Sequence, residues 1–66
     1  MDISKLTARK ILKASGAERV SDTAASELAE AITAFSYSIA KKAVKLAGHA
    51  KRKTVERSDI ELAIAK

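Results

Sequence analysis

The side chains that could carry out catalysis are few and poorly placed for it. The chain has no cysteine and one histidine, so a thiolate nucleophile and a site of Cys and His metal ligands are excluded. His49 is the only general base available to the serines, and Asp59 and Glu61 are two residues apart, which on a helix points them in different directions. We therefore expect no enzyme activity, no cofactor and no metal.

Basic side chains are the remaining source of chemistry, and they are unevenly distributed. The net charge of +5 divides into +3 for residues 1–20, −3 for residues 21–40, +6 for residues 41–57 and −1 for residues 58–66. The densest cluster is Lys51-Arg52-Lys53, with Arg57 close behind. Such segregation favours a polyanionic partner, either nucleic acid or an anionic membrane surface, although a basic surface that only aids solubility is the alternative.

The elements that position these charges are predicted to be helices. The chain has no proline and two glycines, and it is rich in strong helix formers. Gly16 is typical of a helix C′ residue, Ser21 of an N-cap, and Ser58-Asp59-Ile60-Glu61 has the spacing of a capping box. We predict a single domain over residues 1–66, with helices over about 3–15, 22–49 and 57–66 and loops over 16–21 and 50–56.

The predicted central helix is too long to be covered by its own chain. About 27 residues span roughly 40 Å, whereas a compact monomer of this length has a diameter of roughly 28 Å. Fourteen of the 31 hydrophobic residues are alanine, and no disulfide can compensate for a small core. We therefore expect a second copy to cover the apolar stripe of this helix. The stripe includes Leu28, Ile32, Phe35, Ile39, Ala43 and Leu46.

The composition also argues against a membrane protein or a secreted one. The longest purely apolar run is Leu62-Ala63-Ile64-Ala65, and a membrane-spanning helix needs about 20 apolar residues. The first five residues lack the apolar core of a signal peptide. We expect a soluble protein of the cytoplasm.

Three segments of the chain resemble archaeal histones. Gly16-Ala17-Glu18-Arg19-Val20-Ser21-Asp22 is similar to their first loop. The run from Lys45 to Val55 is similar to their second loop, and Asp59-Ile60-Glu61-Leu62-Ala63 to the start of their third helix. The resemblance covers essentially the whole chain. It implies the all-α histone fold and an obligate head-to-tail dimer, in which two long helices cross in a handshake around Leu28, Ile32, Phe35 and Ile39.

The resemblance also implies a function. Such dimers bind, bend and wrap double-stranded DNA without reading its sequence, and so compact the nucleoid, which places the protein on the chromosome in the cytoplasm. Arg19 would enter the minor groove, with Thr54 holding it across the dimer, and backbone amides near Val20 and Ser21 would bind phosphate. The implied DNA-binding residues are Lys10, Lys13, Arg19, Val20, Ser21, Arg52, Lys53 and Thr54.

Higher assembly is implied as well, with the chain itself and other histone paralogues as protein partners. Dimers would meet end to end through Leu46, His49, Asp59 and Leu62. A contact between His49 and Asp59 across this interface would explain the lone histidine, although a helix-terminal histidine that interacts with the helix dipole is the simpler alternative. Gly16 would allow superhelix turns to stack closely. Family members usually differ at Ala34, Gly48 and Lys51, so we expect long superhelical fibres to be less stable here.

Two other functions stay open at this stage. A histone-fold dimer can serve as an interaction module of a transcription complex, but such proteins often lose the loop arginine and lysine residues that this chain retains. A membrane-surface amphipathic helix would need a basic polar face on the long helix, whereas residues 21–40 are net acidic.

Overall fold

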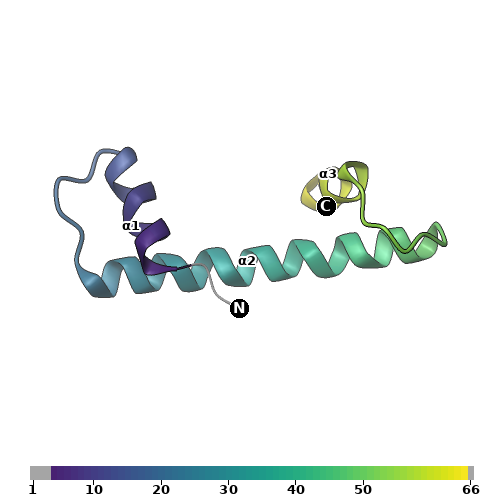
Figure 1. The fold of residues 1–66 in the computed structure, drawn as a ribbon, viewed down its shortest axis with the longest axis horizontal. Coiled ribbons are helices and arrows are strands. Elements are labelled where there is room, and N and C mark those ends of the chain that lie inside the picture. Colours follow the sequence, from purple (N-terminus) through teal and green to yellow (C-terminus); the bar gives the residue numbers. More distant parts are fainter. Residues whose placement is uncertain (1–3, 66) are drawn as a thin grey trace. The chain divides into compact units, whose positions relative to one another are not determined.

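Three α-helices make up the fold in a computed structural model that describes residues 4–65 (Figure 1). They are α1 (Lys5–Ala14), α2 (Asp22–His49) and α3 (Arg57–Ala65), and no strand occurs within the described range. The all-α prediction is therefore confirmed. The ends predicted at residues 3 and 66 lie outside the described residues. No helix between residues 4 and 65 has an apolar stretch long enough to span a bilayer.

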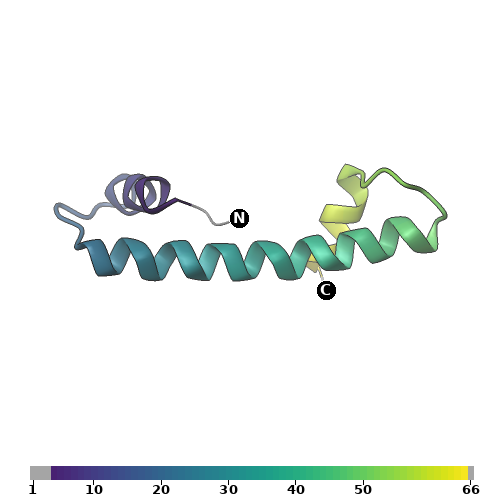
Figure 2. The same cartoon turned by 60° about the horizontal axis from the view of Figure 1, so that its bottom comes forward.

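The long helix α2 continues without interruption for 28 residues, or about 42 Å (Figures 1 and 2). It begins at Ser21, which is the predicted N-cap. The Ser21 hydroxyl oxygen accepts a hydrogen bond from the amide of Ala24 at 3.1 Å, and its carbonyl accepts one from Ala25 at 3.1 Å. Asp22 follows in the first turn, where a negative charge is stabilised by the helix dipole.

Both α1 and α2 end in a Schellman motif, with one residue in the left-handed region. After α1 this residue is Gly16, with φ at 115°, which confirms its predicted role as a C′ residue. The amides of Gly16 and Ala17 donate to the carbonyls of Lys13 and Leu12, both at 3.1 Å. After α2 the equivalent residue is Lys51, with φ at 58°, even though lysine lacks the conformational freedom of glycine.

The amide of Lys51 donates to the carbonyl of Gly48, and that of Arg52 donates to the carbonyl of Ala47, both at 2.9 Å. These bonds satisfy carbonyls in the last turn of α2 that the helix itself leaves unpaired. The left-handed backbone at Lys51 therefore completes a regular helix end. The side chain at that position is not of the type that this backbone favours.

The start of α3 differs from the predicted capping box. The carbonyl of Glu56 accepts hydrogen bonds from the amides of Asp59 and Ile60, so Glu56 rather than Ser58 is the N-cap. Asp59 reaches back and accepts a hydrogen bond from the Glu56 amide at 2.8 Å. The prediction was wrong because an acid three residues after the cap satisfies the capping amide, and here that acid is Asp59 rather than Glu61.

The chain divides into two compact units between Ala34 and Phe35. In the first unit, α1 lies beside the N-terminal part of α2 (Figures 1 and 2). The residues buried there are Ala8 of α1 and Ala25 and Ala29 of α2. Small side chains thus fill this interior, and the larger Leu28 and Ile32 are only half-buried.

In the second unit, α3 lies beside the C-terminal part of α2 (Figures 1 and 2). Its buried residues are Ala43, Ala47, Asp59 and Ala63. As in the first unit, alanine is the only hydrophobic residue that is buried, and no large side chain among residues 4–65 is fully enclosed.

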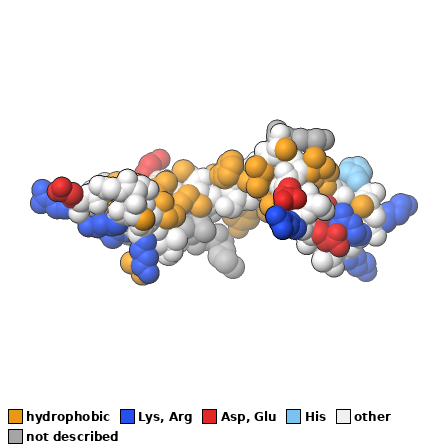
Figure 3. Space-filling view, turned by 90° about the horizontal axis from the view of Figure 1, so that it is seen from above, with side chains coloured by type: hydrophobic (Ala, Val, Ile, Leu, Met, Phe, Trp, Pro, Cys, Tyr) orange, Lys and Arg blue, Asp and Glu red, His pale blue; other side chains and the backbone are white. Residues whose placement is uncertain are grey.

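Large apolar side chains instead reach the surface, where they are visible as orange patches in the space-filling view (Figure 3). Phe35 is 65% exposed, and Leu6 and Ile64 are each 61% exposed. Burial of such a side chain stabilises a protein by about 1.5–3 kcal/mol. Most of that stabilisation is missing in the lone chain.

Candidate nucleic-acid interface

Two side chains of α1 hold the first loop, which covers residues 15–21. The Arg9 guanidinium donates to the carbonyl of Val20 at 2.6 Å, and the Lys13 ammonium donates to the carbonyl of Glu18 at 2.7 Å. A carbonyl carries no net charge, and an ammonium has three donors. Lys13 therefore keeps its positive charge and spare donors for a phosphate while it positions the loop.

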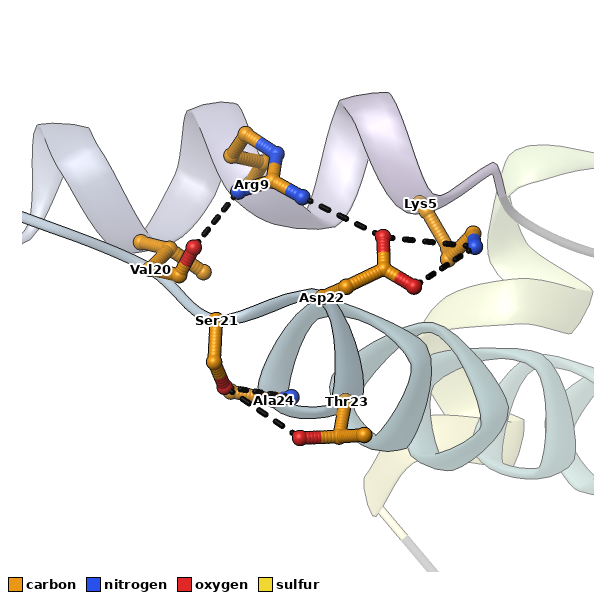
Figure 4. A network of polar contacts seen from close by, with 7 residues as sticks. All are labelled: Lys5, Arg9, Val20, Ser21, Asp22, Thr23 and Ala24. Carbon is orange, nitrogen blue, oxygen red and sulfur yellow. Dashed lines mark hydrogen bonds and ion pairs between the residues drawn. The ribbon is translucent and has the colours of Figure 1, made fainter.

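A second set of contacts joins α1 to the start of α2 (Figure 4). The Asp22 carboxylate lies 3.1 Å from the Lys5 ammonium and 3.5 Å from the Arg9 guanidinium. All three side chains are at least one-third exposed, so the pairs contribute little stability. They neutralise the one carboxylate at the N-terminus of α2, which would otherwise repel an anion there.

Sequence reasoning assigned no role to Lys5 or Arg9. A signal was nevertheless present, because residues 21–40 contain three acids and no base. Asp22 therefore had to find its cations in another segment, and the basic helix before the loop was the nearest source.

Three predicted DNA-binding residues end at the N-terminus of α2. Arg19 is exposed and makes no hydrogen bond or ion pair with any described residue. Val20 is half-buried because its carbonyl is held by Arg9. Ser21 is used as the helix cap. The N-terminus of a long helix favours anions, so the three residues place a free cation beside a ready anion site.

The second loop is organised by a bidentate ion pair. The Arg52 guanidinium donates to both carboxylate oxygens of Asp59 at 2.9 Å, and to the carbonyl of Thr54 at 3.0 Å. Glu56 adds a longer ion pair to Arg52 at 3.6 Å. Asp59 is 4% exposed, whereas the Arg52 side chain is 33% exposed. The predicted phosphate contact of Arg52 would therefore come from a side chain already engaged in fixing the loop.

This arrangement shifts the titration of both partners. Hydrogen bonds from Arg52 and from the Glu56 amide lower the pKa of the Asp59 carboxyl to about 2. The bond to Asp59 raises the pKa of the Arg52 guanidinium. The pair therefore stays charged across the physiological range, and Arg52 cannot be treated as a free cation.

Free cations remain in both loops and on the helices. Lys10, Lys51 and Lys53 are exposed and have no hydrogen-bond or ion-pair partner in residues 4–65. Figure 3 shows blue Lys and Arg side chains around each of the two loops. Thr54 is exposed in the second loop, and its carbonyl is held by Arg52.

The residues predicted to join dimers lie in the second unit, but they differ in exposure. His49 and Leu62 are exposed, Leu46 is half-buried and Asp59 is buried. Leu46 and His49 line a cavity of about 300 Å³ with Lys42, Lys45 and Ala63. Asp59 already accepts three hydrogen bonds within its own chain. The contact between His49 and Asp59 stays a prediction, and it would have to use the little acceptor capacity that remains.

The structure thus gathers the predicted residues into two groups. Lys10, Lys13 and the segment 19–21 belong to the first unit, and the segment 52–54 belongs to the second. The pairing of Arg19 with Thr54 concerns two chains and stays a prediction. Within residues 4–65, no group of His, Asp and Glu side chains could hold a metal ion.

Comparison with known proteins gives consistent matches. Residues 3–64 match the family model described as histone-like transcription factor (CBF/NF-Y) and archaeal histone. The chain is 49% identical over 55 residues to a probable archaeal histone 3 of Methanocaldococcus jannaschii, with 83% of this chain and 82% of that protein covered. It is 44% identical over 55 residues to the archaeal histone HAN1 of Thermococcus zilligii, with the same coverage.

Proposed function

Because the chain belongs to the family of histone-like transcription factors and archaeal histones, we propose that it is a DNA-binding chromatin protein. In this proposal it binds double-stranded DNA without sequence specificity, and it bends and wraps the duplex. Dimers that assemble end to end form larger particles and compact the chromosome in the cytoplasm. No catalytic step is involved.

The observation that carries the proposal is the set of uncompensated cations around the two loops. Lys10, Arg19, Lys51 and Lys53 have no ion-pair partner among the described residues, whereas nearby Asp22 and Asp59 are both neutralised by basic partners. A surface of this kind attracts a polyanion over many angstroms and gains from the release of counterions. Its side chains do not define a base-reading pattern, which supports backbone recognition.

The chemistry of binding follows from the two groups. Arg19 enters the minor groove, and Thr54 from the other chain of a dimer holds it there. Lys10, Lys13, Arg52 and Lys53 contact phosphates, and the amides after Ser21 bind another phosphate at the N-terminus of α2. Such contacts bend DNA because successive sites on one protein surface pull the backbone toward it.

The exposed apolar residues support a dimer. Phe35 is in the middle of the predicted core stripe and is 65% exposed in the lone chain, and Leu28, Ile32 and Ile39 are only half-buried. A second copy crossing α2 would cover these side chains in the handshake arrangement. Another histone paralogue could take the same place, and the composition of the dimer in the cell distinguishes the two partners.

Assembly beyond the dimer uses the residues at the end of α2 and in α3. Leu46, His49, Asp59 and Leu62 meet their equivalents in the next dimer, and Gly16 leaves space for adjacent turns of the superhelix. The cavity beside Leu46 and His49 offers an apolar hollow for a side chain of the neighbouring dimer.

Two measurements test the proposal. Nuclease digestion of DNA reconstituted with the protein should leave protected fragments in regular length steps, whereas uniform degradation at low salt would contradict wrapping. Competition between duplexes of mixed and defined sequence should show little preference. Strong selection of one sequence would instead favour the transcription-factor branch of the family.

Replacing Arg19 with alanine should weaken DNA binding by about 1.5–3 kcal/mol, the usual contribution of a hydrogen bond to a charged group. The measurement is a titration of labelled duplex at fixed salt. Lys41→Ala is a matched control, because Lys41 is also exposed and unpaired in the described residues but lies outside the loops. Equal effects of the two substitutions would show that Arg19 has no special position.

A further inference from the structure

The backbone at Lys51 is unusual for its residue type. Lys51 is the one non-glycine residue with positive φ among residues 4–65, and it holds the position at which α1 uses Gly16. The hydrogen bonds of the two helix ends follow the same pattern, so the geometry itself does not require a lysine. Glycine would make the same bonds without steric strain.

The Lys51 side chain offers the fold little in return. It is exposed, and it forms no hydrogen bond or ion pair with any residue in the described range. A cation near the C-terminus of α2 interacts favourably with the helix dipole, but this interaction is weak when the charge is in water. Strain that the fold does not use is a reason to look for a role outside it.

The charges around the second loop indicate that role. Arg52 is bound to Asp59 at 2.9 Å through both oxygens and lies 3.6 Å from Glu56. Its positive charge is therefore largely compensated within the loop. Lys51 and Lys53 are left as the uncompensated cations of this loop, on either side of Arg52.

We propose that Lys51 is a DNA-binding residue, and that it contacts a backbone phosphate from the strained end of α2. The inference rests on the proposed function and extends it to a residue outside the implied DNA-binding set. In this view Lys51 and Lys53 supply the free charge of the second loop, and Arg52 chiefly fixes the loop that carries them. The left-handed backbone turns the Lys51 side chain away from the helix and leaves its ammonium in solvent.

The test is the salt dependence of DNA binding by the full chain. The association constant for a duplex of mixed sequence is measured at several salt concentrations for the wild type and for Lys51→Gly, Lys51→Arg and Lys41→Gln. Each phosphate contact contributes about 0.9 to the slope of log K against log salt concentration. Lys51→Gly should therefore make the slope shallower by about 0.9 per chain, Lys51→Arg should keep it, and Lys41→Gln should change it much less.

Thermal unfolding separates this role from a structural one. Lys51→Gly should unfold at the same or a higher temperature, because it removes a strained residue while DNA binding weakens. A lower unfolding temperature with an unchanged slope would assign Lys51 to the helix end and overturn the proposal. An equal loss of slope in Lys51→Gly and Lys41→Gln would overturn it too, since it would reflect net charge alone. Failure of the wild type to bind any duplex would instead contradict the proposed function itself.

Discussion

At the scale of single residues, the two helix ends show how backbone conformation and side-chain type can disagree. Gly16 and Lys51 occupy the same position of the same motif, but only Gly16 has the freedom to adopt positive φ readily. The glycine could be recognised in advance because it follows a helical stretch and no other residue type is so common there. Lysine carries no such signal, so the end of α2 could be located only approximately.

Substituting the two glycines by alanine should have opposite effects on stability. A methyl group would meet open space at both positions, but Gly16 has φ at 115° and Gly48 lies inside α2. Gly16→Ala should destabilise the fold by about 1–2 kcal/mol, because a side chain is strained in that region. Gly48→Ala should stabilise it by about 0.5–1 kcal/mol through helix propensity. Urea denaturation of both variants measures these changes, and equal signs would contradict the assignment of the helix end.

At the scale of elements, the contact between the second loop and α3 depends on one carboxylate. Asp59 joins two partners, Arg52 through two bonds and the Glu56 amide through one. It caps α3 and holds the loop at the same time. The sequence analysis allowed for other partners of Asp59, but it placed the cap of α3 two residues too late because serine is the commoner N-cap.

This carboxylate predicts how stability changes in acid. The pKa of Asp59 is about 2 in the fold, whereas an aspartate in an unfolded chain titrates at about 3.9. The unfolded state therefore binds the proton first. The contribution of Asp59 is complete above about pH 4 and declines as the pH falls toward 2. Chemical denaturation at a series of pH values should show this loss.

Two variants isolate the effect. Asp59→Asn should be less stable at neutral pH and should lack this acid-dependent step, because the carboxylate is gone. Asp22→Asn is the matched control, since the ion pairs of Asp22 are exposed and contribute little. A step of full size in Asp59→Asn would mean that other carboxylates cause the acid dependence.

The order and type of the helices were predictable for clear physical reasons. The absence of proline, the glycines near two helix ends and the long apolar stripe all indicate a short helix, a long one and another short one. Specific contacts were harder to predict. The pairs of Lys5 and Arg9 with Asp22 depend on how far α1 folds back along α2, and spacing along the chain does not contain that information.

At the scale of the whole molecule, the exposed Phe35 separates a monomer from a dimer. In a monomer, Phe35→Ala would remove a side chain that is 65% exposed, and the change in stability would be within about 0.5 kcal/mol. In the proposed dimer the same side chain is in the core, where loss of a phenylalanine costs about 3–5 kcal/mol. We expect the larger value. Val44→Ala is the control, because Val44 lies on the opposite face of α2 and is 59% exposed.

Concentration provides an independent measurement. A dimer that does not persist as folded monomers unfolds at a temperature that rises with protein concentration. The mass in solution should be close to twice the 7.0 kDa of one chain. A stable monomer with a concentration-independent unfolding temperature would contradict the dimer and the DNA-binding surface that depends on it.

The interior built from alanine has a consequence for how much of the protein a cell can hold. A copy that has not found a partner retains only weak internal packing, so it opens readily and is cut by proteases. Newly made chains survive in proportion to the number of copies already present. In the proposed dimer, therefore, the steady-state amount of the protein should rise more steeply than its rate of synthesis. A small change in production would be amplified in the amount available to cover the chromosome.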